Sequence, residues 1–346
     1  GIGETALSVE PEIEQVFIAR PDTISNAEEF ERKLYVLRNH ASHMAAAGIP
    51  SDDPVGLYFA SMSCRTLVYK GQLTSLQLRY YYPDLQDARF VSAFGLVHSR
   101  FATNTFPSWK LAQPFRFIAH NGEINTIQGN LNWLKTSEKS LQSASFSREE
   151  MEMLLPVVSG GQSDSAYIDN MIELLTLSGR SLPQVMMMLI PEAWDGNPHM
   201  AAYKKAFYEY HASFMEPWDG PAAICFTNGQ LIGATLDRNG LRPARYLITH
   251  DERVILASET GVLPLPPDIV REKGRLQPGK MFLVDLVQGR VIGDEEIKQE
   301  ICTARPYAEW LEKYKIRIEE LPDPRVTFAP LEPAQVFKYQ QSFGYT

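Results

Sequence analysis

A long helical block between two sets of strand-like segments constrains the fold of this chain more than any other feature. The block runs from Ser147 to about Met215 and is broken at Pro156, at Gly179 and around 195–198. After the block, short apolar strands are paired across polar turns: Ala222–Thr227 with Gln230–Leu236, Ala244–Thr249 with Val254–Ser258, and Met281–Leu286 with Arg290–Gly293. The Asn-Gly turn of the first pair is a strong hairpin signal. This order predicts an α+β fold with mainly antiparallel sheets.

The part before the helical block is predicted to contain one long helix among strands. The helix covers Asn26–Ala47, because a Ser-Asn pair can cap its start and Gly48-Ile49-Pro50 stops it. Strands are predicted at Glu12–Arg20, Val55–Met62, Thr66–Gln72, Phe90–Arg100 and Pro114–Ile124, and a helix from Thr126 to about Ser140.

The last part of the chain has a different composition. Asp294–Tyr314 is charged and helical in pattern, Leu321–Pro333 is Pro-rich and typical of a linker, and Gln335–Thr346 resembles the start of another domain. We therefore expect one domain over residues 1–310 and a linker with the beginning of a second domain over residues 311–346.

Charge and cysteine content exclude several classes of function. The net charge is −9 and no basic cluster interrupts it, so nucleic acid is not expected as a partner. The longest apolar stretches are too short to span a bilayer, and residues 1–6 do not resemble a signal peptide. The three cysteines (Cys64, Cys225 and Cys302) stand far apart, without the spacing of a metal site. This pattern favours a reducing compartment and a cytoplasmic location.

Three short segments carry the polar residues that could do chemistry: HSRFATNT, AHNGEINTI and GGQSDSA. Arg100 follows an apolar run that we expect to be a buried strand, so its guanidinium needs a carboxylate or carbonyl partner. A structural ion pair would satisfy it as well as a substrate would.

Asn121-Gly122 ends the next predicted strand. A primary amide beside a glycine N–H can form an oxyanion hole, although an ordinary Asn-Gly turn is the commoner explanation of this pair. Asp164 follows a glycine pair and precedes a helix. Either it binds an ammonium group, or it or Ser163 caps the helix.

Other polar residues are weaker candidates. His98 and His120 each lie close to one of these segments, and we expect them to support strand ends rather than to act as bases. The polar turn 237–243 is either a loop near the site or a surface loop. The sequence contains neither a P-loop nor a strand–GxGxxG–helix unit, so a bound nucleotide cofactor is not supported.

Taken together, these segments resemble the glutamine amidotransferase domain of the class with an N-terminal nucleophile, and more closely the large (α) subunit of glutamate synthases. The order and spacing of HSRFATNT, HNGEINTIQGN and SDS are similar to that family, as are YFASMSCRTLVY, DRNGLRPARY and ASETGV. The resemblance covers nearly the whole chain. It implies a four-layer α/β/β/α fold and the hydrolysis of L-glutamine to glutamate and ammonia, which the full enzyme transfers to 2-oxoglutarate.

The resemblance also implies roles for individual residues. Arg100 would hold the α-carboxylate of glutamine and Asp164 its α-ammonium group, while Asn121 and Gly122 would form the oxyanion hole. In the family, a cysteine at the mature N-terminus is the nucleophile and its own α-amine is the base. FMN and an iron–sulfur cluster are expected in the full-length enzyme, and neither they nor a metal ion is expected in this chain.

This chain departs from the family pattern because it begins with Gly1 and not with cysteine. We therefore interpret it as an internal fragment of a longer enzyme, inactive by itself, with a truncated form of the family fold. The alternative is a non-catalytic glutamine-binding or assembly module derived from the same fold. The reading frame upstream of Gly1 would discriminate between them.

The expected partners are L-glutamine, the rest of the large subunit and a small electron-donating subunit. We also expect an exposed sheet edge in the truncated fold, protected by a homodimer of the fragment or by the chain's own terminal segment.

Overall fold

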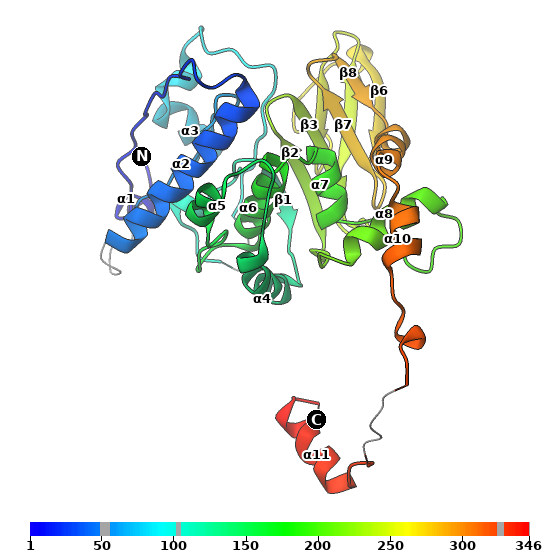
Figure 1. Cartoon of the computed structure of the whole chain (residues 1–346). Coiled ribbons are helices and arrows are strands. Elements are labelled where there is room, and N and C mark those ends of the chain that lie inside the picture. The colour runs from blue at the N-terminus through cyan, green and yellow to red at the C-terminus, as the bar shows by residue number, and fades with distance from the viewer. Residues whose placement is uncertain (49–55, 102–104, 324–328, 346) are drawn as a thin grey trace. The chain divides into compact units, whose positions relative to one another are not determined.

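The computed structural model describes residues 1–48, 56–101, 105–323 and 329–345. The chain divides into two compact units, Gly1–Tyr307 and Ala308–Thr346. The first unit contains both β-sheets and most of the helices (Figure 1).

The larger sheet has five strands in the order β1-β2-β3-β7-β8, and all of its neighbouring strands are antiparallel. Its strands are β1 (Ile118–Gly122), β2 (Ala222–Thr227), β3 (Leu231–Leu236), β7 (Met281–Asp285) and β8 (Arg290–Ile292). The predicted hairpins therefore form, and the 114–124 strand is confirmed in its second half. β1 lies at one end of this sheet, so one of its edges has no neighbouring strand in the described part of the chain.

The β2–β3 hairpin shows why its sequence folds locally. The Asn228 side chain accepts hydrogen bonds from the Gln230 and Leu231 N–H groups, and Gly229 has a positive φ of 88°. Asparagine and glycine are the residues that such a turn favours. Phe226 and Ile224 on β2 are almost fully buried, so the hairpin also supplies the centre of the core.

The second sheet has three strands in the order β5-β4-β6, where β4 is Arg245–Thr249, β5 is Val254–Ala257 and β6 is Val270–Arg275. The β4–β5 pair was predicted and β6 was not. Most side chains of β6 are charged and exposed, which suits an edge strand but gives no apolar alternation. Buried residues from around both sheets, among them Leu236 and Leu276, pack into one apolar cluster.

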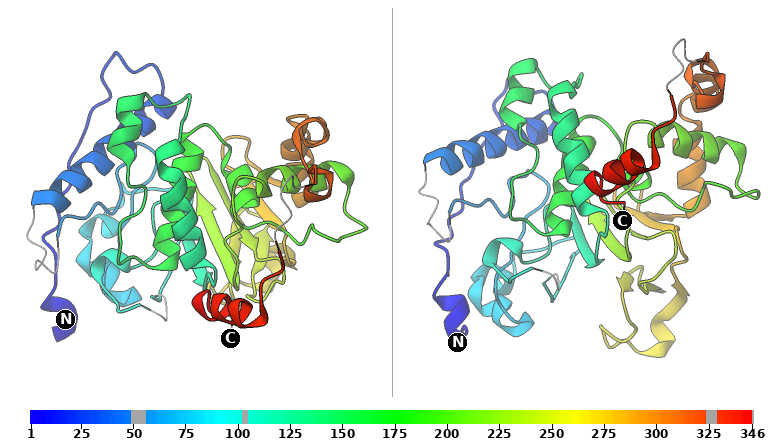
Figure 2. Two further views of the ribbon diagram at one scale, coloured as in Figure 1. Left: turned by 60° about the horizontal axis from the view of Figure 1, so that its bottom comes forward. Right: turned by 90° about the horizontal axis from the view of Figure 1, so that it is seen from below.

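The helical block is confirmed, with breaks near the predicted positions: α5 (Arg148–Leu154), α6 (Asp164–Leu177), α7 (Leu182–Leu189) and α8 (Ala202–Ala212). Almost every residue of α6 and α7 is buried. α6 packs on β1, and α2 (Ala27–Gly48) packs on α5 and α6. The views in Figure 2 show α2 on the far side of α5 and α6 from the sheet. The predicted helix after β1 is α4 (Ile127–Ser137), followed by a 3₁₀ turn (Glu138–Ser140).

Four predicted strands before β1 are wrong. Residues 12–20 and 90–100 have no strand structure, and Phe17 and Val91 are 90% and 84% exposed. The described part of 55–72 bends at 64–65, between the two predicted strands. Its backbone N–H groups donate to side chains instead of to another strand: Ser61 Oγ accepts the Val68 N–H and Ser63 Oγ accepts the Thr66 N–H. No described backbone segment offers these residues a ladder partner, and a strand requires one.

The remaining elements are short or lie towards the C-terminus. They are α1 (Glu4–Leu7), α3 (Ser75–Tyr81), α9 (Asp294–Thr303), α10 (Tyr307–Tyr314), α11 (Pro333–Ser342) and the 3₁₀ turns Pro83–Gln86, Trp109–Leu111, Pro267–Ile269 and Ile318–Glu320. α9 and α10 confirm the helical pattern of 294–314, with a break between them. None of the helices in the described ranges is long and apolar enough to cross a membrane.

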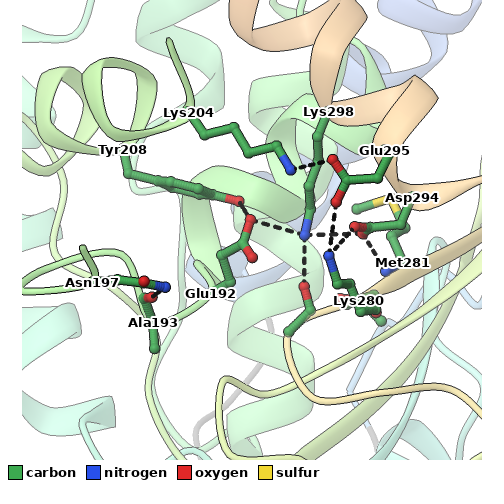
Figure 3. A network of polar contacts seen from close by, with 12 residues as sticks. Glu192, Ala193, Asn197, Lys204, Tyr208, Lys280, Met281, Asp294, Glu295 and Lys298 are labelled. Carbon is green, nitrogen blue, oxygen red and sulfur yellow. Dashed lines mark hydrogen bonds and ion pairs between the residues drawn. The ribbon is translucent and has the colours of Figure 1, made fainter. Parts of the chain in front are cut away.

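A buried charged network joins α9 to the rest of the first unit (Figure 3). The Lys298 ammonium group lies 2.9 Å from a Glu192 carboxylate oxygen and 2.9 Å from Asp294, and donates to the Gly279 carbonyl at 2.8 Å. The Tyr208 hydroxyl on α8 donates to Glu192. The network therefore fixes α9 against α8 and against the turn before β7.

Candidate active site at the open edge of strand β1

The open edge of β1 is a row of backbone groups that side chains satisfy one by one. In an edge strand, alternate residues direct their N–H and C=O groups away from the partner strand. On β1 these are Ile118, His120 and Gly122, followed by Ile124 just beyond the strand. The Ile118 N–H donates to Asp169, the His120 N–H to Gln113 and the Ile124 N–H to Asp164, at 3.1, 2.7 and 2.9 Å. Three outward-facing N–H groups of this edge are therefore satisfied by side chains of the chain, and not by its terminal segment as predicted. Protection by a homodimer stays a prediction.

Gly122 is the exception in this row. Its register partner is Ala222, whose N–H and C=O bond Asp237 on the β3 side, so the pair Gly122–Ala222 exchanges no hydrogen bond. The Gly122 N–H thus faces the open edge, and no residue among those the structure describes accepts it. A Cβ atom at this position would lie 1.9 Å from the Pro221 carbonyl oxygen. The site requires glycine because of this close approach.

Asp164 is not the helix cap. Ser163 caps α6, since its side chain accepts the Ala166 N–H. Asp164 is 5% exposed and accepts from the Ile124 N–H through Oδ2 and from the Ser165 N–H through Oδ1. The carboxylate therefore lies beside the segment that follows Gly122, two residues beyond the free N–H group.

His120 and His98 support the strand, in agreement with the prediction. His120 is buried, and its Nδ1 lies 2.9 Å from the Ser165 hydroxyl and 3.9 Å from Asp164. Burial lowers the pKa of His120 to about 4, so the ring is neutral at pH 7. His98 Nε2 lies 2.9 Å from the His120 carbonyl oxygen, and burial also lowers the pKa of His98.

Arg100 lies two residues after His98, and two residues span at most about 7 Å. The expectation that Arg100 follows a buried strand is wrong, because residues 90–100 form no strand. The Arg100 side chain is exposed and forms no ion pair with a residue in the described ranges. Residues 102–104 of the HSRFATNT segment lie outside the described residues. The structure thus brings Asp164 close to the strand end that contains Gly122, with Asn121 as the preceding residue of the strand. The Arg100 backbone lies near the same edge, but its guanidinium forms no hydrogen bond or ion pair with these residues.

No sequence motif indicated the buried ion network that holds the start of β1. Arg116 lies 2.8 Å from Glu173 and 3.3 Å from Asp169, and Arg38 on α2 lies 2.6 Å from Glu173. Asp169 also accepts the Phe117 N–H at 2.8 Å. These carboxylates stand five and nine positions after Asp164 on α6, yet only the tertiary fold shows which backbone groups they meet.

The turn 237–243 lies beside the site rather than on a remote surface. Asp237 is buried and its carboxylate accepts the Ala222 N–H at 2.9 Å, next to the register partner of Gly122. Arg238 pairs with Asp219, whose carbonyl accepts the Asn125 N–H. The turn therefore contacts and stabilises the loop that precedes β2, and through Asp219 the loop that follows β1.

None of the three cysteines is prepared to act as a nucleophile. Burial raises the pKa of Cys64 and of Cys225 to about 11, and that of Cys302 to about 12. A thiol reacts as its thiolate, and these raised pKa values leave very little of any of the three as thiolate near pH 7. The described residues also contain no cluster of His, Cys, Asp and Glu side chains that could hold a metal ion.

Residues 1–310 match the family described as class-II glutamine amidotransferases. The NADPH glutamate synthase large chain of Bacillus subtilis is 48% identical over 100% of this chain and 22% of its own length. The NADH glutamate synthase of Schizosaccharomyces pombe is 44% identical over 100% and 17%, and the ferredoxin-dependent glutamate synthase 2 of Synechocystis is 40% identical over 100% and 22%. The chain spans only about a fifth of the length of these relatives.

Among solved structures, the glutamine phosphoribosylpyrophosphate amidotransferase of B. subtilis aligns with 57% of this chain and 34% of its own, with a TM-score of 0.29 and 19% identity. This likeness is too small to argue from. The α+β fold is instead evident from the elements themselves, and the family from the match over most of the sequence. The chain is a member of the class-II glutamine amidotransferases.

Proposed function

We propose that this chain forms the glutamine-binding and oxyanion-stabilising part of the glutaminase site of a glutamate synthase. The observation that carries the proposal is the free N–H group of Gly122. The outward-facing N–H groups on either side of it are bonded to Gln113 and Asp164, and the Gly122 N–H has no acceptor among the described residues, so it is left for a ligand. An unpaired donor at a strand end, beside the Asn121 amide, suits a developing oxyanion.

In this proposal the substrate lies along the open edge of β1. The amide oxygen of glutamine accepts from the Gly122 N–H and the Asn121 side chain. Its α-ammonium group binds Asp164, whose oxygens can accept more bonds than they do in this structure. Its α-carboxylate binds Arg100, which is free of other ion pairs among the described residues and can turn to form a bidentate pair.

The chemistry requires a thiolate that attacks the amide carbon to form a tetrahedral intermediate, whose oxyanion the donor groups on β1 stabilise. The intermediate takes up a proton on nitrogen and expels ammonia, and water then hydrolyses the resulting thioester to glutamate and the free thiol. Since the three cysteines of this sequence are not activated, we propose that the nucleophile belongs to another part of the enzyme. An iron–sulfur cluster does not fit the described residues, which offer no group of cysteines to hold one. We therefore propose that the cluster, and with it FMN and the transfer of ammonia to 2-oxoglutarate, belongs to the rest of the large subunit.

The proposed partners are the rest of that subunit and a small electron-donating subunit. The three free thiols are usual for a reducing compartment, which supports the cytoplasm as the location.

Pairwise isotope labelling tests glutamine binding directly. Asparagine precedes glycine at Gly122, Gly229 and Gly240, so labelling of asparagine carbonyl carbon and glycine nitrogen gives three amide signals. We expect L-glutamine to shift the Gly122 signal saturably, and to leave that of Gly229, in the β2–β3 turn, in place. D-glutamine serves as the control ligand.

The variant Asp164→Asn keeps an acceptor for the Ile124 N–H and removes the charge, so it tests the ammonium contact. Removing the charge should cost about 1.4 kcal/mol or more of binding free energy, because the contact with the ammonium group is charge-assisted. The Kd for L-glutamine should then rise at least about tenfold. A Gly122 signal that does not respond to L-glutamine would refute the proposed function.

A further inference from the structure

Gln113 forms an unusual pair of bonds with the open edge of β1. Its side-chain amide donates from Nε2 to the His120 carbonyl at 3.0 Å, and its Oε1 accepts the His120 N–H at 2.7 Å. Gln113 is 8% exposed and His120 is 2% exposed, so neither bond is easily replaced by water. The amide of Gln113 thus occupies the place that the backbone of a neighbouring strand would take.

The contact between Gln113 and His120 lies next to the free Gly122 N–H group. His120 immediately precedes the Asn121-Gly122 pair, and Asp164 holds the Ile124 N–H at 2.9 Å on the other side. The free N–H of Gly122 therefore lies between two backbone groups that side chains hold in place, at His120 and at Ile124, each two residues away. This edge has no neighbouring strand among the described residues.

Gln113 is itself firmly placed. The Phe115 N–H donates to the Ile118 carbonyl at 2.8 Å, which folds residues 113–118 back along the start of β1. Phe115 and Ile118 are both buried. The side chain that fixes His120 is therefore mounted on the same well-packed segment as the strand.

We propose that Gln113 is a positioning residue for the oxyanion hole, acting through the His120 backbone on the direction of the Gly122 N–H. This inference deepens the proposed function and rests on it. Without the Gln113 amide, the His120 N–H has no acceptor among the described residues, and the His120 carbonyl keeps only His98 Nε2 at 2.9 Å. The end of β1 can then tilt, so the donor at Gly122 is no longer held in one direction. Donors aimed at an oxyanion act by being fixed before the reaction, and small misplacements are costly.

The test uses the Gly122, Gly229 and Gly240 signals in the whole chain. Gln113→Met removes both bonds at similar length and volume. Gln113→Glu keeps the acceptor for the His120 N–H and removes the donor to the carbonyl. The matched control is Thr249→Val, because Thr249 is also buried and its hydroxyl accepts the Arg253 N–H at 2.9 Å in the second sheet.

For Gln113→Met we expect the Gly122 signal to move or broaden without ligand, and the Kd for L-glutamine to rise about 3- to 10-fold, the effect of one or two lost hydrogen bonds. Gln113→Glu should fall between the wild-type chain and Gln113→Met, and decides the matter if Gln113→Met does not fold. Thr249→Val should lose stability and leave both measurements unchanged.

The proposal is overturned if a folded Gln113 variant, with Gly229 and Gly240 at their wild-type positions, keeps the Gly122 signal and a Kd within twofold of wild type. If the wild-type chain ignores L-glutamine, the proposed function fails. The ligand-free Gly122 signal still shows whether Gln113 positions that N–H group.

Discussion

Replacing Lys298 with methionine should destabilise the first unit far more than its surface charge would suggest. The lysine side chain is 2% exposed and lies 2.9 Å from both Glu192 and Asp294 (Figure 3). Methionine fills a similar volume but supplies neither charge nor donor. The two carboxylates, which are 15% and 12% exposed, then lose their shared counter-ion.

The size of the loss in unfolding free energy depends on which hydrogen-bond and ion-pair partners each carboxylate retains. Removing one partner of a buried ion pair costs about 3–5 kcal/mol. Asp294 retains Lys280 at 2.8 Å and the Met281 N–H at 2.8 Å, and Glu192 retains the Tyr208 hydroxyl at 3.0 Å. We therefore expect the low end of the range, about 3 kcal/mol of unfolding free energy, measured by urea denaturation of the whole chain.

Lys204→Met is the matched control, because it removes the same charge from a lysine in the same network. The partner of Lys204 is Glu295, which is 67% exposed and also contacts Lys280 at 3.0 Å. Exposed pairs contribute about 0–1 kcal/mol. A difference between the two variants of less than about 1 kcal/mol would refute the argument that burial of the Lys298 partners sets the cost.

Three further outcomes are expected. Gly122→Ala should destabilise the chain by about 1–3 kcal/mol, because the added Cβ atom clashes with the Pro221 carbonyl. Gly129→Ala should stabilise it by about 0.5–1 kcal/mol, because Gly129 lies in helix α4 and an added Cβ atom there meets no other atom within 4 Å. Thermal unfolding of the two variants measures both effects. Burial lowers the pKa of Lys70 to about 7, so the unfolded chain binds the extra proton between pH 7 and 10. Stability should then rise with pH in that window by at most about 4 kcal/mol, and urea titrations of Lys70→Met should lack the rise. The chain alone should release no ammonia from glutamine, and turnover near 1 per second or faster would contradict the proposed external nucleophile.

Local sequence predicted the second half of the molecule well. The Asn228-Gly229 turn, the paired apolar runs around it and the capped helices of the 147–215 block depend on residues close in sequence, and the structure contains them. The family was likewise evident from short motifs in fixed order. β6 escaped prediction because an edge strand with charged side chains is stabilised by its neighbour and not by its own pattern.

The strands predicted before β1 failed for the opposite reason. The residues of 12–20 and 90–100 have the apolar content of strands, but a strand exists only where another backbone completes its ladder, and no described segment does so. Whether such a partner is present is a property of the whole fold that no local pattern contains.

The sequence by itself determined the chemistry available at the candidate site: an amide and a glycine side by side, a carboxylate at a helix start and an arginine. Only the tertiary structure decided how they are used. It brought Asp164 to the Ile124 N–H from forty positions away and Gln113 to the His120 backbone, and left the Gly122 N–H between them without a partner in the described chain. The physical reason is that a backbone donor is free or satisfied according to what lies opposite it in space, and spacing along the chain does not encode that.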